Sequence, residues 1–359
     1  MGTFAFLVHP LNIEDVAKKY RIAKRISPKV VGSVLRRRRP FVMAEIEGIQ
    51  SITGEKAVGW FVVVPLLPWQ FYELEEDKVL DKLAKACNVA AKEGAKIVGL
   101  GAFTAMPGEG GKKLLGMSSI PVTTGNTYTT ATAIQGTEQA MKEMGIEASR
   151  ATLAVVGATG SIGSACAQVL AKQFTRTLLI GRDSDKLMAL TDHLTRLGAR
   201  QVEFSTDISG SLPQADVVIS VTGAVDAIIR PEDIKSGAVV CDVARPRDVS
   251  KAVTQVRDDV LVIDGSIVKP PGAVDFHIDF GPPPGMCEGC VGETIILALE
   301  ERYEPYTIGK NISLARVEEM TSLAAKHGFE LAGLRREETL LDAGEIARVK
   351  KAVAAKSTD

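Results

Sequence analysis

The chain has 359 residues, of which 45% are hydrophobic and 24% charged, and its formal net charge is −1 at pH 7. These values are typical of a globular protein with an ample core and predict two or three domains. The near-neutral charge argues against nucleic acid or an anionic membrane as the main partner. No apolar run reaches the roughly 18 residues that a transmembrane helix needs, so no membrane span is expected.

The first nine residues lack the basic segment of a signal peptide and are typical of a strand. Five cysteines in a chain of this size are too few for a disulfide framework. Both observations favour a reducing, cytoplasmic location. Three of the cysteines stand in apolar helix or strand patterns and are expected in the core: Cys87, Cys166 and Cys241.

Residues 1–149 predict an N-terminal α/β domain. Strands are expected at residues 4–8, 42–49, 57–66, 97–102 and near 121–122, and helices at 13–24, 27–39, 78–93 and 126–144. Ser27 and Pro28 suit an N-cap and a first helical position. The run from Arg36 to Arg39 is the densest charge cluster; a solvated helix end is the simpler interpretation, and a docking patch for an acidic partner is the alternative.

Residues 150–275 alternate between strand and helix patterns. Strands are expected at 152–156, 177–180, 201–204, 217–220, 238–242 and 260–263, with helices at 161–173, 184–197 and near 231–234. Such alternation predicts a doubly wound parallel sheet with right-handed crossovers. A ligand then binds beyond the carboxyl ends of the strands.

A glycine-rich turn joins the first of these strands to the helix that follows it. Gly157, Gly160 and Gly163 have G-x-x-G-x-x-G spacing, directly after the apolar run at 153–156. Small residues let the backbone approach a pyrophosphate, and the helix N-terminus offers it free N–H groups. The placement between strand and helix makes a dinucleotide site the favoured interpretation over a ligand-free turn. The predicted cofactor-binding residues are Gly157, Ala158, Thr159, Gly160, Ser161, Ile162 and Gly163, with Thr222 and Gly223 near the nicotinamide.

The end of the second strand of this domain indicates which nicotinamide is bound. A site for NAD has an acidic residue there, which holds the ribose 2′-OH. Here Arg182 is the first side chain after Ile180 that can reach a ribose, and Lys186 follows closely. A guanidinium pairs with a 2′-phosphate, so NADPH is the predicted cofactor. Asp183 would instead favour NAD if the strand ran one residue longer.

Residues 276–359 are expected to form a catalytic-cysteine loop and C-terminal helices. A loop rich in proline and glycine covers 269–285, and helices are expected at 290–301, 314–327 and 337–354. Cys287 and Cys290 stand where this loop enters a helix, and a thiol in the first turn of a helix is expected to have a lowered pKa. A zinc site would need two more ligands, and a redox pair would follow a first strand. One of the two cysteines is therefore a candidate nucleophile, packing being the alternative.

Further candidate catalytic residues precede these segments. His277, shortly before the cysteine loop, could act as a general acid near neutral pH, although a structural loop histidine is the simpler interpretation. Thr124 and Asn126 flank Gly125 at the start of a predicted helix. They fit helix capping, and they could also donate hydrogen bonds to a substrate carbonyl oxygen.

Several of these segments together resemble one family, the NADPH-dependent long-chain acyl-[acyl-carrier-protein] reductases of cyanobacteria. The matching segments, between about residues 100 and 330, are Gly101-Ala-Phe-Thr104, Thr123-Thr-Gly-Asn-Thr127, Ala154-Val-Val-Gly-Ala-Thr-Gly160 with Ile162-Gly163-Ser164, Cys290 with Glu293, and Lys326-His-Gly-Phe329.

The resemblance implies a central NADP-binding Rossmann domain and the reduction of a fatty acyl thioester to an aldehyde. It assigns the active cysteine to Cys290 rather than Cys287, with a covalent acyl-enzyme. It implies no metal, and it implies acyl carrier protein or acyl-CoA as substrate carrier, with an aldehyde-consuming enzyme as a further partner. The proline-rich segment 282–284 and the first sixty residues match the family poorly, so the carrier and the acyl chain length stay open. The alternative is an NADP-dependent dehydrogenase of a small hydroxy or amino acid without a covalent step.

Overall fold

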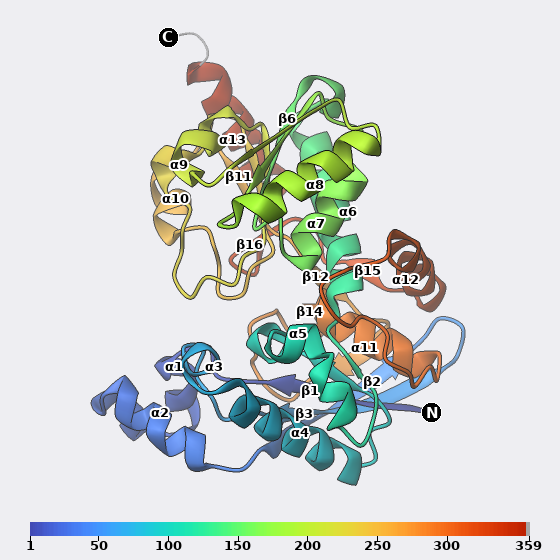
Figure 1. Ribbon diagram of the computed structural model, residues 1–359. Coiled ribbons are helices and arrows are strands. Elements are labelled where there is room, and N and C mark those ends of the chain that lie inside the picture. Colours follow the sequence, from blue (N-terminus) through green and yellow to red (C-terminus); the bar gives the residue numbers. More distant parts are fainter. Residues whose placement is uncertain (357–359) are drawn as a thin grey trace. The chain divides into compact units, whose positions relative to one another are not determined.

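The computed structural model describes residues 1–356, and its contacts divide the chain into two compact units (Figure 1). Both units are discontinuous along the chain. The first unit comprises Met1–Tyr128, Lys269–Lys310 and Met320–Glu330. The second comprises Thr129–Val268, Asn311–Glu319 and the chain from Leu331 onward.

The first unit contains a six-stranded mixed sheet in the order β13-β2-β3-β1-β4-β5. Its central strands β3, β1, β4 and β5 are parallel, whereas β2 and β13 join antiparallel at one edge. The strands are β1 (Gly2–Val8), β2 (Phe41–Gln50), β3 (Lys56–Val63), β4 (Val98–Leu100), β5 (Val122–Thr123) and β13 (Gly272–Asp275).

Helices cover both faces of this sheet. α4 (Glu76–Lys92) buries one face with side chains such as Leu80 and Leu83. α11 (Gly289–Leu299) packs on the other, and Figure 1 shows the two helices on opposite sides of the strands. The remaining helices of the unit are α1 (Ile13–Lys19), α2 (Pro28–Arg37), α3 (Gln70–Glu73), α5 (Pro107–Gly111) and the 3₁₀ helices η1 (Arg21–Arg25), η2 (Ala102–Ala105) and η3 (Lys113–Gly116).

The second unit contains a six-stranded sheet in the order β11-β10-β9-β6-β7-β8, and every pair in it is parallel. This order is that of the doubly wound dinucleotide-binding fold, so the predicted fold class is confirmed. The strands are β6 (Thr152–Val156), β7 (Arg176–Ile180), β8 (Gln201–Ser205), β9 (Val217–Ser220), β10 (Val239–Asp242) and β11 (Leu261–Asp264).

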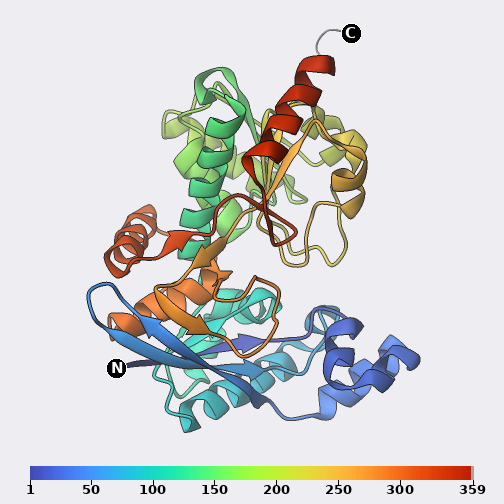
Figure 2. The same ribbon diagram turned by 180° about the vertical axis from the view of Figure 1, so that it is seen from behind.

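Two hydrophobic clusters lie on the two faces of this parallel sheet. The larger cluster joins the sheet to α6 (Asn126–Met144), α7 (Ser161–Leu170), α8 (Ser184–Arg196) and α13 (Ala343–Lys356). Figure 2 shows α6 and α13 side by side over the strands. The opposite cluster includes Leu212, Ile234 and Val253, from η5 (Leu212–Gln214), the segment after η6 (Pro231–Asp233) and α10 (Lys251–Val256). The short helix α9 (Ile208–Ser211) precedes η5.

Most predicted elements are present, with one clear error near the C-terminus. A helix was expected over 337–354, but a hairpin of β16 (Arg335–Arg336) and β17 (Thr339–Leu340) precedes α13. Glu337 and Glu338 turn this hairpin with positive φ values of 51° and 64°. The Glu338 N–H donates to Asp264 at 2.8 Å and its carboxylate pairs with Arg247. These tertiary contacts override the local helix pattern.

The division into units does not follow the expected boundaries at residues 149 and 275. α11 and the cysteine loop belong to the first unit, whereas α13 belongs to the second. The chain passes between the units within α6, β12 (Ile267–Lys269), α12 (Leu314–His327) and β15 (Glu330–Leu331), and between Lys310 and Asn311. The other short elements are η4 (Ala148–Arg150) and β14 (Cys287–Glu288).

Candidate functional site

In the second unit, the turn after β6 is shaped by three glycines. Gly157 has a φ of +80°, and a Cβ there would overlap the carbonyl of Val221. A Cβ on Gly163 would lie 2.5 Å from the Gly157 carbonyl oxygen, and Gly160 is the N-cap of α7. A side chain at Gly157 or Gly163 would thus overlap neighbouring backbone, whereas a Cβ at Gly160 would make one tight contact of 3.2 Å, with the Gly157 carbonyl oxygen. The turn lies between β6 and β9, where the strand order reverses and dinucleotides bind.

A buried carboxylate holds the neighbouring loop after β9. Asp248 is 0% exposed, and it accepts hydrogen bonds from Ser220 Oγ at 2.7 Å, Thr222 N at 2.9 Å and Thr222 Oγ1 at 2.5 Å. Burial raises the pKa of Asp248, against these hydrogen bonds, which lower it. Sequence reasoning missed Asp248, because a single aspartate in a loop carries no motif. It fixes Thr222, a predicted cofactor residue, beside Gly157.

A surface pocket of about 640 Å³ lies at the β7–α8 junction. Arg182, Asp183 and Lys186 of this junction line it, together with Thr159 from the turn after β6. Asp183 is the N-cap of α8: it accepts from Lys186 N at 3.1 Å and forms an ion pair with the Lys186 ammonium. The side-chain bond from the Lys186 ammonium, followed by the bond from its backbone N–H, holds the pKa of Asp183 below its ordinary value. β7 ends at Ile180, so the strand does not extend to present Asp183 to a ribose. Arg182 is exposed beside this pocket.

In the first unit, Cys290 lies in the first turn of α11 at the carboxyl edge of the mixed sheet. α11 runs antiparallel to β1 and β4, because Cβ atoms built at Gly2, Gly99 and Gly125 would meet Ala298, Thr294 and Cys290 respectively. Gly125 lies two residues after the end of β5 and has a φ of +72°, and its missing side chain makes room for Cys290. Four cysteines are buried and Cys290 is half-buried.

A buried glutamate joins α11 to the segment after β5. Glu293 is 0% exposed and accepts from Thr123 Oγ1 at 2.5 Å, Thr307 Oγ1 at 2.8 Å and Tyr128 N at 3.0 Å. Burial raises the pKa of this carboxyl, and the three donors act in the opposite direction. Glu293 thereby fixes the first turn of α11, and with it Cys290, against residues 123–128.

The predicted lowering of the nucleophile's pKa is wrong for the protein in this structure. Burial raises the pKa of the Cys290 thiol above its ordinary value, and the charges of Glu288 and Glu293 act in the same direction. The Val291 N–H, at the helix start, acts against them, but desolvation outweighs it. Cys287 is fully buried, and burial raises the pKa of its thiol well above the ordinary value as well. Although Cys290 lies at a helix N-terminus, desolvation keeps its thiol protonated at neutral pH.

The other predicted catalytic residues occupy different settings in the first unit. The Thr124 hydroxyl is buried and donates to the Thr307 carbonyl at 3.1 Å, so its proton is engaged. Asn126 is half-buried at the first position of α6. His277 lies on an exposed loop, where its ring contacts Glu47 at 3.1 Å and Asp275 at 3.4 Å. The structure thus joins Thr124 to the Cys290 region through Thr307, whereas the ring contacts of His277 are with surface carboxylates.

Sequence reasoning also missed His9, which follows β1 at the same carboxyl edge. His9 is 9% exposed; its Nε2 accepts from Phe103 N at 3.3 Å, and its ring packs against Phe71 and Phe103. Burial lowers the pKa of His9 to about 4, so the imidazole is neutral at physiological pH. Its aromatic neighbours Phe71 and Phe103 indicate a packing role. The only feature of the sequence that could have singled it out is its position directly after a strand.

Within the described part of the chain, no helix is both long and apolar enough to cross a bilayer. No group of three or more histidine, cysteine, aspartate or glutamate side chains among residues 1–356 could hold a metal ion.

Comparison with known proteins defines the class of the second unit. Residues 138–264 match the family model described as shikimate / quinate 5-dehydrogenase, which covers less than half of the chain. The match and the glycine-turn geometry together identify an NAD(P)H-binding domain of the kind found in dehydrogenases and reductases. The predicted cofactor class is confirmed.

The individual relatives include two reductases and an aminotransferase, so they do not place the chain in one family. Aminotransferase PigE of Serratia sp. (strain ATCC 39006) is 28% identical over 363 residues, 97% of this chain and 42% of that protein, so the chain spans less than half of that relative. The long-chain acyl-[acyl-carrier-protein] reductase of Synechococcus elongatus is 27% identical over 307 residues, 81% of this chain and 87% of that protein. The glutamyl-tRNA reductase of Corynebacterium efficiens is 32% identical over 130 residues, 33% of this chain and 28% of that protein.

Proposed function

We propose that the protein reduces an acyl thioester to an aldehyde with NADPH, through an acyl group held covalently on Cys290. The observation that carries the proposal is the placement of this thiol. Among the five cysteines, Cys290 alone is not fully buried, and it sits at a helix N-terminus against a glycine that makes room for it. The similarity to the acyl-[acyl-carrier-protein] reductase over 81% of the chain supports the proposal.

The chemistry of the first step is that of a cysteine nucleophile. The deprotonated Sγ of Cys290 attacks the thioester carbonyl carbon, and the carbon–sulfur bond to the carrier breaks, so that the carrier thiolate leaves and takes up a proton. The N–H groups in the first turn of α11 have no carbonyl partners within the helix, and they can donate to the oxyanion that forms. Glu293 keeps this turn in place through its bonds to Thr123 and Thr307.

The residues of the second unit fit NADPH. Gly157, Gly160 and Gly163 admit a pyrophosphate to the N-terminus of α7, and Arg182 is the cation available to a 2′-phosphate. Asp183 is engaged as a helix cap, which favours NADPH over NADH. When bound, NADPH supplies the hydride that reduces the acyl group to an aldehyde.

A second candidate function is an NADP-dependent dehydrogenase of a small hydroxy or amino acid. The match of residues 138–264 to a dehydrogenase family model favours it. That match lies wholly within the second unit and does not include Cys290. A dehydrogenase of this kind needs no thiol, so thiol dependence separates the two functions.

The test is the acyl adduct and its loss. When mixed with a fatty acyl thioester in the absence of NADPH, the wild-type protein should gain the mass of one acyl group. Cys290→Ser should gain none and should lose NADPH-dependent turnover, while NADPH binding and thermal stability are retained. Cys287→Ser, which alters the neighbouring buried thiol, is the matched control and should keep the adduct. Full turnover by Cys290→Ser would refute the covalent mechanism.

A further inference from the structure

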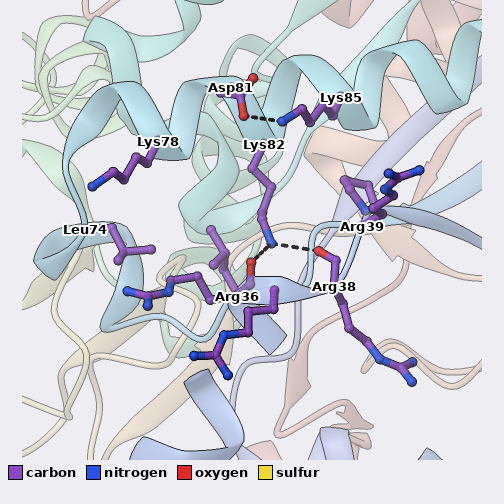
Figure 3. Close-up of a pocket in the computed structure, with 11 residues that line it drawn as sticks. Arg36, Arg38, Arg39, Leu74, Lys78, Asp81, Lys82 and Lys85 are labelled. Atoms are coloured by element: carbon purple, nitrogen blue, oxygen red, sulfur yellow. Dashed lines mark hydrogen bonds and ion pairs between the residues drawn. The ribbon is translucent and has the colours of Figure 1, made fainter. Parts of the chain in front are cut away.

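A strongly basic hollow lies in the first unit, at the end of α2 and beside α4. Its volume is about 520 Å³, and seven cationic residues and one carboxylate line it (Figure 3). We call it the basic surface, formed by Arg36, Arg37, Arg38, Arg39, Lys78, Lys82 and Lys85, with Asp81. Pro40, Leu66 and Leu74 complete its wall. A chain whose net charge is −1 thus concentrates positive charge in one place.

Much of this charge is not neutralised within the chain. Lys85 pairs with Asp81 at 2.5 Å and Lys78 with Glu75 at 3.0 Å. Among the residues that the structure describes, no carboxylate lies within ion-pair distance of Arg36, Arg37 or Arg39, and all three are exposed. Like charges held together repel one another, so an anionic partner would relieve this repulsion.

Lys82 connects α4 to the C-terminal end of α2 within the basic surface. Its ammonium donates to the carbonyls of Arg36 at 2.7 Å and Arg38 at 2.9 Å, which closes the C-terminal end of α2. Partial burial is the largest cause that lowers the pKa of Lys82 to about 8, and the charges of Lys85 and Arg36 act in the same direction. Lys82 therefore maintains the shape of the basic surface, whereas the three unpaired arginines are available to a partner.

An exposed apolar stripe adjoins the arginines. Val30 and Val34 on α2 are 52% and 55% exposed, and Arg37 follows at helical spacing on the same side. Val31 and Leu35, on the other side of α2, are buried in a hydrophobic cluster. A surface that combines apolar side chains with cations is typical of a protein interface, whereas a free phosphate would need cations alone.

The basic surface and Cys290 both lie at the carboxyl ends of the strands of the mixed sheet. Phe41, two residues after Arg39, pairs with Val63 at the carboxyl end of β3. Cys290 meets Gly125, which follows the carboxyl end of β5 in the same sheet. A partner that docks on the basic surface is thereby placed at the edge that carries the nucleophile.

We propose that the basic surface docks the acidic face of a carrier protein that delivers the acyl thioester. The choice of this partner rests on the function proposed above. Figure 3 shows Arg38, Arg39 and Lys78 pointing to different sides of Lys82, so the charges face an extended surface and do not converge on one phosphate of CoA. α2 exposes two valines but no leucine or aromatic side chain, which argues against insertion into a lipid surface.

Equilibrium binding tests docking without the reaction. A holo acyl carrier protein with no acyl group is titrated into the full-length protein without NADPH, at low and at physiological ionic strength. Wild type should bind more weakly at the higher ionic strength. Arg36→Gln/Arg37→Gln/Arg39→Gln should bind at least tenfold more weakly than wild type. The control Lys142→Gln/Lys172→Gln/Arg200→Gln removes equal charge from exposed positions of the second unit and should bind within twofold of wild type.

Further measurements separate the possible failures. Arg36→Lys/Arg37→Lys/Arg39→Lys keeps the charge and should restore binding, which excludes a folding defect as the cause. Equal binding by the glutamine variant and wild type, or a loss confined to CoA or to phosphatidylglycerol vesicles, would overturn the docking proposal. NADPH-dependent reduction of an uncharged N-acetylcysteamine thioester should be the same in all variants. A wild-type protein that reduces no thioester but binds the carrier would refute the proposed function and leave docking standing.

Discussion

Cys290 combines a nucleophile's position with the pKa of a buried thiol. Cys290 lies at a helix N-terminus where Gly125 makes room for it, whereas desolvation and the charges of Glu288 and Glu293 disfavour the thiolate. Both tendencies act at one atom. The protonated thiol therefore predominates at neutral pH, and formation of the thiolate is the step that pH should control.

Alkylation of Cys290 should report this directly. Because only the thiolate reacts, the rate of modification by iodoacetamide should keep rising, close to tenfold per pH unit, from pH 7 to beyond pH 9. An ordinary thiol begins to level off near its pKa of about 8.5. Intact mass measured over time follows the reaction, with Cys290→Ser as the control for the four buried cysteines. A plateau below pH 8 would show that the thiol pKa is lowered after all.

At the residue scale, local sequence could predict positions but not surroundings. The glycines and Cys290 stand out because each belongs to a short motif next to a strand or helix. The partners of Glu293 do not, since Thr123 is 170 residues away along the chain and only the fold brings it near. The lowered thiol pKa was inferred from the helix terminus alone. Burial, which reverses it, depends on side chains from distant segments.

At the element scale, helix ends and turns decide several functional features. α6 and α12 have the predicted bounds because their apolar spacing and flanking residues agree. The hairpin at residues 335–340 was missed because its turn is fixed by Arg247 and Asp264 from elsewhere. At the β7–α8 junction, Asp183 and Arg182 were both candidates for the ribose, and the structure separates their settings: Asp183 caps α8, whereas Arg182 is exposed.

That separation predicts the cofactor behaviour of two variants. Arg182→Ala should weaken NADPH binding by about 1–3 kcal/mol, the range of a charge-assisted hydrogen bond, and barely change NADH binding. Asp183→Ala removes the α8 cap and should lower the melting temperature while leaving the NADPH-to-NADH preference unchanged. Fluorescence titration with each cofactor, together with thermal melts, makes the comparison. An equal loss of both cofactors in Arg182→Ala would exclude the 2′-phosphate role.

At the scale of the whole molecule, the chain builds its two units from interleaved segments. Sequence patterns predicted the alternation that forms the second unit, because each strand and helix there is local. They placed the boundaries at 149 and 275, since composition along the chain cannot show that α11 returns to the sheet of the first unit or that α13 joins the second. Which apolar faces meet is settled only by packing over long sequence separations.

The stability of the protein should carry the signature of one buried carboxyl in the second unit. Asp242, at the end of β10, is 1% exposed and accepts from Val249 N at 2.9 Å and Ala244 N at 3.1 Å. Burial is the largest cause that raises the pKa of Asp242 to about 6. An unfolded aspartate has a pKa of about 3.9. Between these two values the folded state binds the proton more tightly than the unfolded chain.

The free energy of unfolding contributed by Asp242 should therefore fall as pH rises from 4 to 6, and stay constant above that window. The difference of about two pKa units corresponds to about 3 kcal/mol. Asp242→Asn cannot ionise, and its one amide oxygen can replace only one of the two carboxylate oxygens that accept from Ala244 N and Val249 N. The two proteins are therefore compared by how their free energies of unfolding change with pH. Urea unfolding at half-unit pH steps should show the variant gaining up to this amount relative to wild type between pH 4 and 6.5. Parallel stability curves for the two proteins would mean that Asp242 ionises in the folded state as easily as in the unfolded chain.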